Sequence, residues 1–315
     1  SAQLMLPAIY INLKRKFLLK KLPADLINYL EEIYEINKNR NKALLKEIYE
    51  ISTLLNLNNI DYAFTKGAAI LIGGYLKDIG ERMVGDIDII VHKKDIKKTC
   101  KLLKNNNYYQ KSNIQEFNHR HLPRFLNKKK IFAIEIHKNL IRDNYSKLMP
   151  TNEILKNKIL NSKNAPFIGD EDLFKNIIYA FQINDLGFNR YFYNIKCSYD
   201  INSIIEKNKQ KIDFKIINLK FIKEFLIIHD LILKKSIVKH IKTRELIYRN
   251  RFIICKKYMF FKKFNYLIMD TYLFIKNYKY KIFQYFTDLS FRNYFNKKIL
   301  RKFKFRFWQW FKYGV

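Results

Sequence analysis

Helical and strand-like patterns of apolar residues alternate along the first half of the chain. Apolar side chains recur every three or four positions through residues 41–57, which predicts a helix. Residues 60–65 and 83–92 are short apolar runs typical of strands, and residues 67–75 between them return to helical spacing. This alternation predicts a unit of helices built around one sheet.

The next segment predicts one more helix and a β-hairpin. Asp95 is placed to cap a basic helix after the second strand. Residues 117–125 and 131–137 have the composition of strands, and an Asn-Lys-Lys-Lys turn at 127–130 separates them. With the hairpin included, the pattern predicts an α+β fold, of α/β-like character, around a mixed sheet.

The pattern changes after Pro150. From Glu171 onward, apolar and aromatic residues recur at three- and four-residue spacing with few turn signals, which predicts a helical domain. We therefore divide the chain into N-terminal helices at 1–40, a domain with the mixed sheet at 41–145 and a basic helical domain at 146–315.

The chain is strongly basic. It carries 61 Lys and Arg residues against 28 Asp and Glu residues, a net charge of +33. Such a charge predicts attraction to polyanions, either nucleic acid or an anionic membrane face. A composition rich in Lys, Asn, Ile, Phe and Tyr is also typical of AT-rich coding sequence, so charge alone does not select a partner.

Cysteine usage and hydropathy indicate the compartment. Cys100, Cys197 and Cys255 are far apart and form no Cys-x-x-Cys pair, which favours neither a zinc knuckle nor a disulfide framework. We find no signal-sequence pattern and no apolar run near the roughly 20 residues that span a bilayer. We expect a cytoplasmic protein and leave peripheral attachment to a membrane open.

Two aspartates stand one residue apart in an apolar run. Side chains alternate along a strand, so Asp86 and Asp88 point to one face while Ile87 and Ile89 point to the core. Like charges held this close repel each other unless a cation or a proton lies between them. The pair therefore predicts a divalent metal site.

Other residues can complete a site for nucleotide transfer. Glu135 offers a third carboxylate from a later strand, where it shares a face with His137. Lys66 and Gly67 lie between a strand and a helix, where backbone N–H groups can approach an anion. Arg82 can reach a triphosphate as a fixed cation. Two divalent ions on three carboxylates would activate an attacking hydroxyl and neutralise the leaving pyrophosphate.

Five motifs carry a family resemblance in both order and spacing. They are Thr65-Lys66-Gly67-Ala68-Ala69, Tyr75, Gly80-Glu81-Arg82, Gly85-Asp86-Ile87-Asp88 and Ile134-Glu135-Ile136-His137. Together they resemble the uncharacterised nucleotidyltransferase family of the DNA polymerase β-like superfamily, which is related to abortive-infection nucleotidyltransferase toxins. The resemblance covers roughly residues 40–205, and Gln182 stands where the family often has histidine.

The resemblance implies a polymerase β-like nucleotidyltransferase core in residues 41–145. It implies two Mg²⁺ ions, with Mn²⁺ as the alternative, on Asp86, Asp88 and Glu135 as catalytic and metal-binding residues. It also implies a nucleotide-binding set made of Lys66, Gly67, Ala68, Arg82 and Gly85. The implied reaction moves a nucleoside monophosphate from an NTP, such as ATP, to an acceptor hydroxyl.

Some of these residues also have a purely structural interpretation. Lys66 can be a surface lysine and Arg82 can pair with a nearby carboxylate. Asp200, in an otherwise apolar helix, can orient a basic residue of the site or cap a turn.

The histidines leave several roles open. His137 fits a buried core histidine slightly better than a ligand. His119 and His121 share one strand face, but no carboxylate or cysteine partner is near them in the sequence, so we favour an acceptor-binding face, or no role, over a metal site.

The acceptor is the least determined part of the function. From Arg251 the chain interleaves Lys and Arg with aromatic residues, most densely at 303–313. We rank packing of this segment into the helical domain first, RNA binding second and an anionic membrane third. We take RNA, with tRNA favoured, as the acceptor. The alternative is a sugar, lipid-linked glycan, protein or small molecule at a membrane surface.

The resemblance to abortive-infection enzymes suggests a toxin or defence role with an antitoxin partner. The sequence leaves the oligomeric state and the base preference open.

Overall fold

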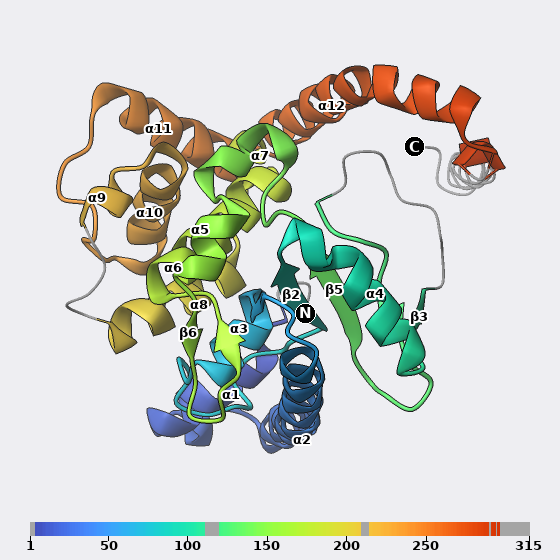
Figure 1. Cartoon of the computed structure of the whole chain (residues 1–315). Helices are drawn as coiled ribbons and strands as arrows, with labels where there is room; N and C mark the ends of the chain where they lie inside the picture. The colour runs from blue at the N-terminus through green and yellow to red at the C-terminus, as the bar shows by residue number, and fades with distance from the viewer. Residues whose placement is uncertain (1–3, 111–119, 209–213, 290, 294, 297–315) are drawn as a thin grey trace.

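Seven short strands form one mixed sheet in the order β3-β4-β5-β2-β1-β7-β6. The computed structural model describes residues 4–110, 120–208, 214–289, 291–293 and 295–296 (Figure 1). The strands are β1 Tyr62–Phe64, β2 Asp86–Val91, β3 Tyr109–Gln110, β4 Phe125–Leu126, β5 Ala133–His137, β6 Ile159–Leu160 and β7 Pro166–Phe167. The fold is α+β with a helical C-terminal region, as the sequence predicts.

Twelve α-helices are described with this sheet. They are α1 Leu6–Arg15, α2 Ala24–Leu57, α3 Lys66–Ile72, α4 Ile96–Asn105, α5 Thr151–Lys156, α6 Asp170–Tyr179, α7 Gly187–Arg190, α8 Ile195–Lys207, α9 Phe214–Ile217, α10 Lys220–Leu233, α11 Thr243–Lys257 and α12 Met259–Thr287. A π-helical turn, Ala180–Asn184, follows α6.

The centre of the sheet is buried on one face by apolar side chains. β2 pairs antiparallel with β1 and parallel with β5. Ile87 and Ile89 of β2 are at most 1% exposed, and Ile134 and Ile136 of β5 are fully buried. This burial holds the opposite face of β2 and β5, which carries the acidic residues, in a fixed register.

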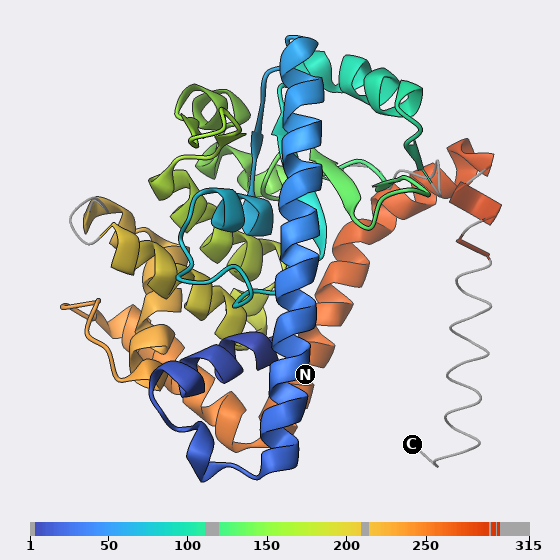
Figure 2. The same ribbon diagram turned by 90° about the horizontal axis from the view of Figure 1, so that it is seen from below.

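The helix predicted at 41–57 is the second half of a longer one. α2 begins at Ala24 and runs without interruption through residue 40 (Figure 2). Its buried residues Leu44, Ile48, Ile51 and Leu55 follow the predicted spacing and join the main core. Polar residues interrupt the apolar pattern in the first half of α2, so the sequence alone did not predict one continuous helix.

Asp95 does not cap α4 through its side chain, so that expectation is wrong. Asp95 ends a 3₁₀ turn, Lys93–Asp95, and makes no side-chain cap hydrogen bond. The backbone N–H of Lys94 instead donates to His92 Nδ1 at 3.3 Å. Asp95 occupies the N-cap position of α4, but the 3₁₀ turn gives it a helical backbone in place of the extended one with which a capping side chain reaches the free N–H groups.

The predicted hairpin exists but is shorter than expected. β4 pairs antiparallel with β5, yet it contains only Phe125 and Leu126. Of the segment predicted as strand at 117–125, residues 117–119 lie outside the described residues, and His121 forms only an isolated bridge with His137.

The sequence pattern missed β3, β6 and β7. Each has two residues, too few to show an alternation. β7 pairs parallel with β1 through Phe64 and Phe167, so residues after Pro150 complete the sheet.

The helical region packs around α6, α8 and α10, whereas α12 runs along the outside of the molecule (Figures 1 and 2). Packing of the C-terminal aromatic residues, which we ranked first, is wrong for α12. Phe260, Phe264 and Leu267 of this helix are 71%, 52% and 65% exposed. Residues 303–313 lie outside the described residues. Among the helices that the structure describes, none combines the length and hydropathy needed to cross a bilayer.

His229 of α10 is a buried histidine with a strongly shifted pKa. Its Nδ1 lies 2.6 Å from Ser198 Oγ, and its Nε2 lies 3.2 Å from Asn202 Oδ1, so it joins α10 to α8. Burial, together with the charge of Lys235, lowers the pKa of His229 from 6.5 to about 4. The folded protein therefore favours the neutral imidazole.

We expect His229 to reduce stability as the pH falls from about 6.5 to about 4, because the unfolded chain then binds a proton that the folded chain excludes. The loss should reach about 3 kcal/mol of unfolding free energy at the acid end. Urea unfolding across this range should show a smaller pH dependence for His229→Asn than for the wild type. His240→Asn, at an exposed position, is the control. Equal pH dependence of wild type and His229→Asn would contradict this assignment.

Candidate functional site

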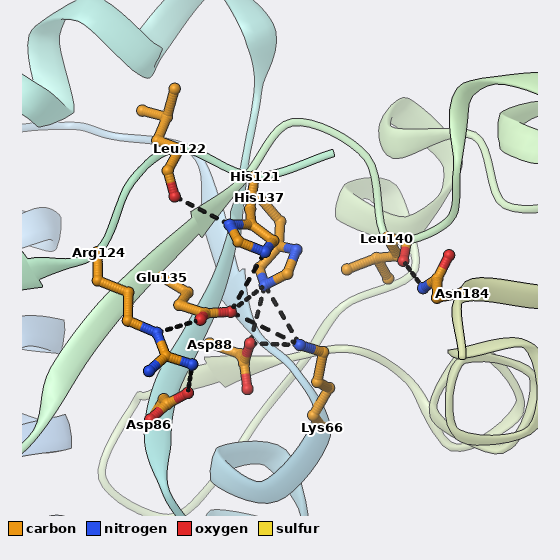
Figure 3. Close-up of polar contacts among 10 residues, drawn as sticks. All are labelled: Lys66, Asp86, Asp88, His121, Leu122, Arg124, Glu135, His137, Leu140 and Asn184. Carbon is orange, nitrogen blue, oxygen red and sulfur yellow. Dashed lines mark hydrogen bonds and ion pairs between the residues drawn. The ribbon is translucent and has the colours of Figure 1, made fainter. Parts of the chain in front are cut away.

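Asp88 of β2 and Glu135 of β5 lie directly opposite each other. The strands pair in parallel, with Asp86 opposite Ala133, Asp88 opposite Glu135 and Ile90 opposite His137. Asp88, Glu135 and His137 are 7%, 5% and 0% exposed, and their side chains converge (Figure 3). Strand pairing thus brings together carboxylates that are far apart in the sequence.

Lys66 places an ammonium group between these acidic side chains. Its Nζ lies 2.6 Å from Asp88 Oδ1 and 3.9 Å from Glu135 Oε2 (Figure 3). His137 Nε2 is 3.5 Å from the same nitrogen. Lys66 begins α3 with a φ of +51°, an uncommon conformation for a residue with a side chain. Its position is that of a counter-ion to the carboxylates rather than of a freely solvated surface lysine.

Burial and the neighbouring charge of Lys66 determine the protonation states of Asp88 and His137. Burial acts to raise the pKa of Asp88, but Lys66 and the hydrogen bond with His137 outweigh burial and hold that pKa well below its ordinary value. Burial and the nearby Lys66 lower the pKa of His137, which therefore stays neutral at pH 7. Its Nε2 lies 2.8 Å from Asp88 Oδ1 and donates, because a carboxylate only accepts.

Arg124 is a site residue that the sequence reading missed. Its Nη2 lies 2.9 Å from Asp86 Oδ2, and its Nε lies 2.6 Å from Glu135 Oε1. Burial raises the pKa of Asp86, and Arg124 acts against that rise. An arginine next to the end of the first predicted hairpin strand, 117–125, was the available signal. Arg124 thus bridges the first and third carboxylates.

His121 also lies at the site, where Glu135, a carboxylate that is distant in the sequence, is close to it. Its Nε2 lies 3.8 Å from Glu135 Oε2, and its ring centroid is 5.1 Å from that of His137. The isolated bridge between the two histidines brings this about, and such a bridge leaves no trace in the sequence pattern. His119 lies outside the described residues.

The donor set suits a metal ion. One ligand atom each from Asp88, Glu135 and His137 lie within 4.8 Å of one another. Carboxylate oxygens suit Mg²⁺ and Mn²⁺, and an imidazole favours a transition-metal ion over Mg²⁺. His137 Nδ1 is buried and has no hydrogen-bond partner in the described part of the chain, so it can carry the ring proton when Nε2 binds a metal ion. Asp86, expected as a ligand, faces Arg124 instead and stands outside this group.

Arg82 lies beneath the first turn of α3 and pairs with Asp200 of α8. Nε and Nη2 of Arg82 lie 2.7 Å and 2.8 Å from the two oxygens of Asp200, and both residues are buried. A Cβ on Gly67 would lie 2.7 Å from Arg82 Nη1 and 2.8 Å from Val84 Cγ1. Glycine at 67 is therefore required for packing on Arg82, and the basic residue that Asp200 orients is Arg82.

Lys196 is a second cation that the sequence reading missed. It lies one helical turn before Asp200 on α8. Burial and the adjacent charge of Arg82 lower the pKa of Lys196 to about 8, while Asp200, Asp88 and Asp86 act in the opposite direction. Its ammonium group therefore interacts electrostatically with the acidic site. The spacing of Lys196 and Asp200 on one helix face could have indicated it.

The remaining expected residues lie beside these groups. Ala68 is fully buried in the first turn of α3. Gly85 is exposed immediately before Asp86, and a Cβ there would meet no atom within 4 Å. Gln182 is buried and donates to the backbone oxygen of Phe221 at 3.2 Å.

Comparisons with known proteins point to one family. Residues 1–221 match a family model described as uncharacterised nucleotidyltransferase. Among solved structures, the chain is similar to an antigenic nucleotidyltransferase-like protein from Paracoccidioides brasiliensis, at 18% identity and a TM-score of 0.41, over 62% of this chain and 89% of that one. None of the curated proteins matches the chain.

We expect Asp200→Ala to destabilise the protein by about 3–5 kcal/mol, because it leaves the Arg82 guanidinium buried without its partner. Asp270→Ala is the matched control. Asp270 is 62% exposed and pairs with Arg190 at 2.6 Å, so its loss should cost about 1 kcal/mol or less. Urea unfolding measures both. Similar losses in the two variants would show that the Arg82–Asp200 pair is no more important than a surface pair.

We expect Lys66→Met to lower the melting temperature without added metal, because Asp88 and Glu135 lose the ammonium group between them. Mn²⁺ should then raise the melting temperature more in Lys66→Met than in the wild type. Lys158→Met, which removes a surface pair with Asp61, is the control and should respond to Mn²⁺ as the wild type does. An equal response to Mn²⁺ in all three proteins would argue against a cation site at Asp88 and Glu135.

Proposed function

Since the chain belongs to the uncharacterised nucleotidyltransferase family, we propose that it transfers a nucleoside monophosphate from an NTP to an acceptor hydroxyl and releases pyrophosphate. The observation that carries this proposal is the buried pair of Asp88 and Glu135, held opposite each other on parallel strands with a cation between them. Two buried carboxylates are costly without positive charge beside them, and the divalent ions that nucleotidyl transfer requires would supply it.

Asp86, Asp88 and Glu135 would hold two Mg²⁺ ions, or Mn²⁺. When bound, these ions polarise the phosphate and lower the pKa of the attacking hydroxyl. His137 would position Asp88 through its 2.8 Å hydrogen bond. Arg124 would release Asp86 and Glu135 to the metal and turn to the substrate, since 57% of its side chain is exposed.

The cations around the site would bind the triphosphate. Lys66 and Lys196 lie near the carboxylates and can neutralise charge on the leaving pyrophosphate. Gly67 and Ala68 would present backbone N–H groups to the phosphates. Gly85 leaves open space before Asp86. Arg82, predicted as a phosphate ligand, would act indirectly, since Asp200 engages its guanidinium and Gly67 packs against it.

For the acceptor we propose RNA, with tRNA as the first candidate. Four cations oppose, through their charges, the rise in the pKa of Asp185 that burial causes: Arg120, Lys66, Arg142 and Arg190. These cations and the net charge of +33 suit a polyanionic acceptor. A toxin or defence role, with an antitoxin partner, would follow from an RNA target.

A second acceptor class is a sugar, lipid-linked glycan, protein or small molecule at a membrane surface. The exposed apolar residues of α12 favour it, because they would place the enzyme at such a surface.

Label transfer tests the proposal. The full chain is incubated with Mg²⁺ or Mn²⁺, each NTP labelled at the α-phosphate, and total RNA, lipid extract or protein in separate reactions. We expect label in the RNA, reduced about a hundredfold or more in Asp86→Asn/Asp88→Asn. Asp25→Asn, at an exposed position of α2, is the control for a lost carboxylate.

Label in none of the three pools would contradict nucleotidyl transfer, and label that survives in Asp86→Asn/Asp88→Asn would contradict the site. Label in lipid or protein but not in RNA would contradict RNA as the acceptor and would favour the second acceptor class.

A further inference from the structure

α12 carries a stripe of large apolar side chains that faces solvent. We call it the α12 stripe: Phe260, Phe264, Leu267, Ile268, Ile275 and Ile282 are 71%, 52%, 65%, 44%, 65% and 39% exposed. Their spacing of three, four and seven residues places them on one side of a helix. A contiguous apolar surface of this kind is rare on a protein with no partner for it.

The opposite side of α12 packs on the protein through polar contacts. Asp270 Oδ1 accepts from Arg190 Nη2 at 2.6 Å, and the side-chain amide of Asn265 donates to the backbone oxygen of Asn189 at 2.7 Å. The Arg190 guanidinium also lies 5.1 Å from the ring centroid of Tyr266. A helix that simply completed the core would have the reverse arrangement, with its apolar side inward.

Positive charge predominates in the segment that carries the stripe. Residues 243–296, which include α11 and α12, contain eleven Lys or Arg residues and three Asp or Glu residues. Lys256 and Lys257 are exposed at the end of α11, and Lys263 is exposed in the first two turns of α12. Figure 1 shows α12 (orange to red) running outward beyond the other helices.

We infer that the α12 stripe docks on an anionic membrane surface, with its apolar side chains at the acyl-chain boundary and its lysines among the phosphates. The surface lies outside the nucleotide site, so the inference holds whichever acceptor that site uses. Basic charge beside a one-sided apolar face is the pattern of helices that lie in a membrane interface.

The composition of the stripe favours this occupant over two others. Its middle members Leu267, Ile268 and Ile275, with Ile282, are aliphatic and offer no ring on which a nucleic-acid base can stack, whereas exposed aromatic residues, Phe260 and Phe286, lie towards the ends of α12. A second copy of the chain would bring its own positive charge against these lysines, and like charges across an interface oppose association.

Vesicle flotation tests the inference with the full chain. The vesicles contain either phosphatidylcholine alone or equal parts of phosphatidylcholine and phosphatidylglycerol. We expect the wild type to float with the anionic vesicles and at least about tenfold less with the neutral ones. Leu267→Glu/Ile275→Glu should reduce flotation with the anionic vesicles about tenfold or more. Leu57→Glu, at a position 78% exposed at the end of α2, should float as the wild type does.

Several results would overturn the inference. The wild type could fail to float, or it could float equally with both kinds of vesicle. The third such result is an equal loss of flotation in Leu267→Glu/Ile275→Glu and in Leu57→Glu. A dimer or an RNA complex that Leu267→Glu/Ile275→Glu disrupts, found without vesicle binding, would assign the stripe to a second copy or to nucleic acid. Label transfer to a freely diffusing acceptor should be the same in this variant and the wild type, so failure of docking and failure of nucleotidyl transfer are distinguishable.

Discussion

Two buried carboxylates on adjacent parallel strands are the constraint on which the site depends. Asp88 and Glu135 sit opposite each other because β2 and β5 pair in one register, and the isoleucines on the other face fix that register in the core. Burial of two like charges requires positive charge beside them. The ammonium group of Lys66 supplies that charge in this structure, and divalent metal ions would supply it during catalysis.

A second buried charge joins the sheet to the helical region. Arg82 comes just before β2, whereas Asp200 comes from α8, so their bidentate pair fixes α8 beside the first turn of α3. Gly67 allows that turn to approach Arg82 closely. Lys196 lies one turn along α8, so the same pair brings a cation from the helical region to the acidic site. Gly67, Arg82 and Asp200 therefore hold one another in place through direct contacts.

The sequence predicted the elements that carry strong periodicity and the residues that carry unusual chemistry. β2 and β5 lie within the predicted segments, and α3 begins one residue before its predicted segment, 67–75. Asp88 and Glu135 converge as their strand positions suggested. Arg124 and His121 were not predicted as partners of Glu135, because pairing between distant segments places them there. The exposed side of α12 was predicted as buried, since an apolar stripe has the same spacing whether it faces a core or another apolar environment.

Electron paramagnetic resonance of Mn²⁺ tests the cation site most directly, because it counts bound ions without requiring turnover. In a titration with an NTP present, we expect the wild type to bind Mn²⁺. Glu135→Gln and Asp88→Asn should each bind Mn²⁺ about tenfold or more weakly. Mn²⁺ bound equally by the wild type and both variants, or by none of the three, would contradict the claim that Asp88 and Glu135 form a metal site.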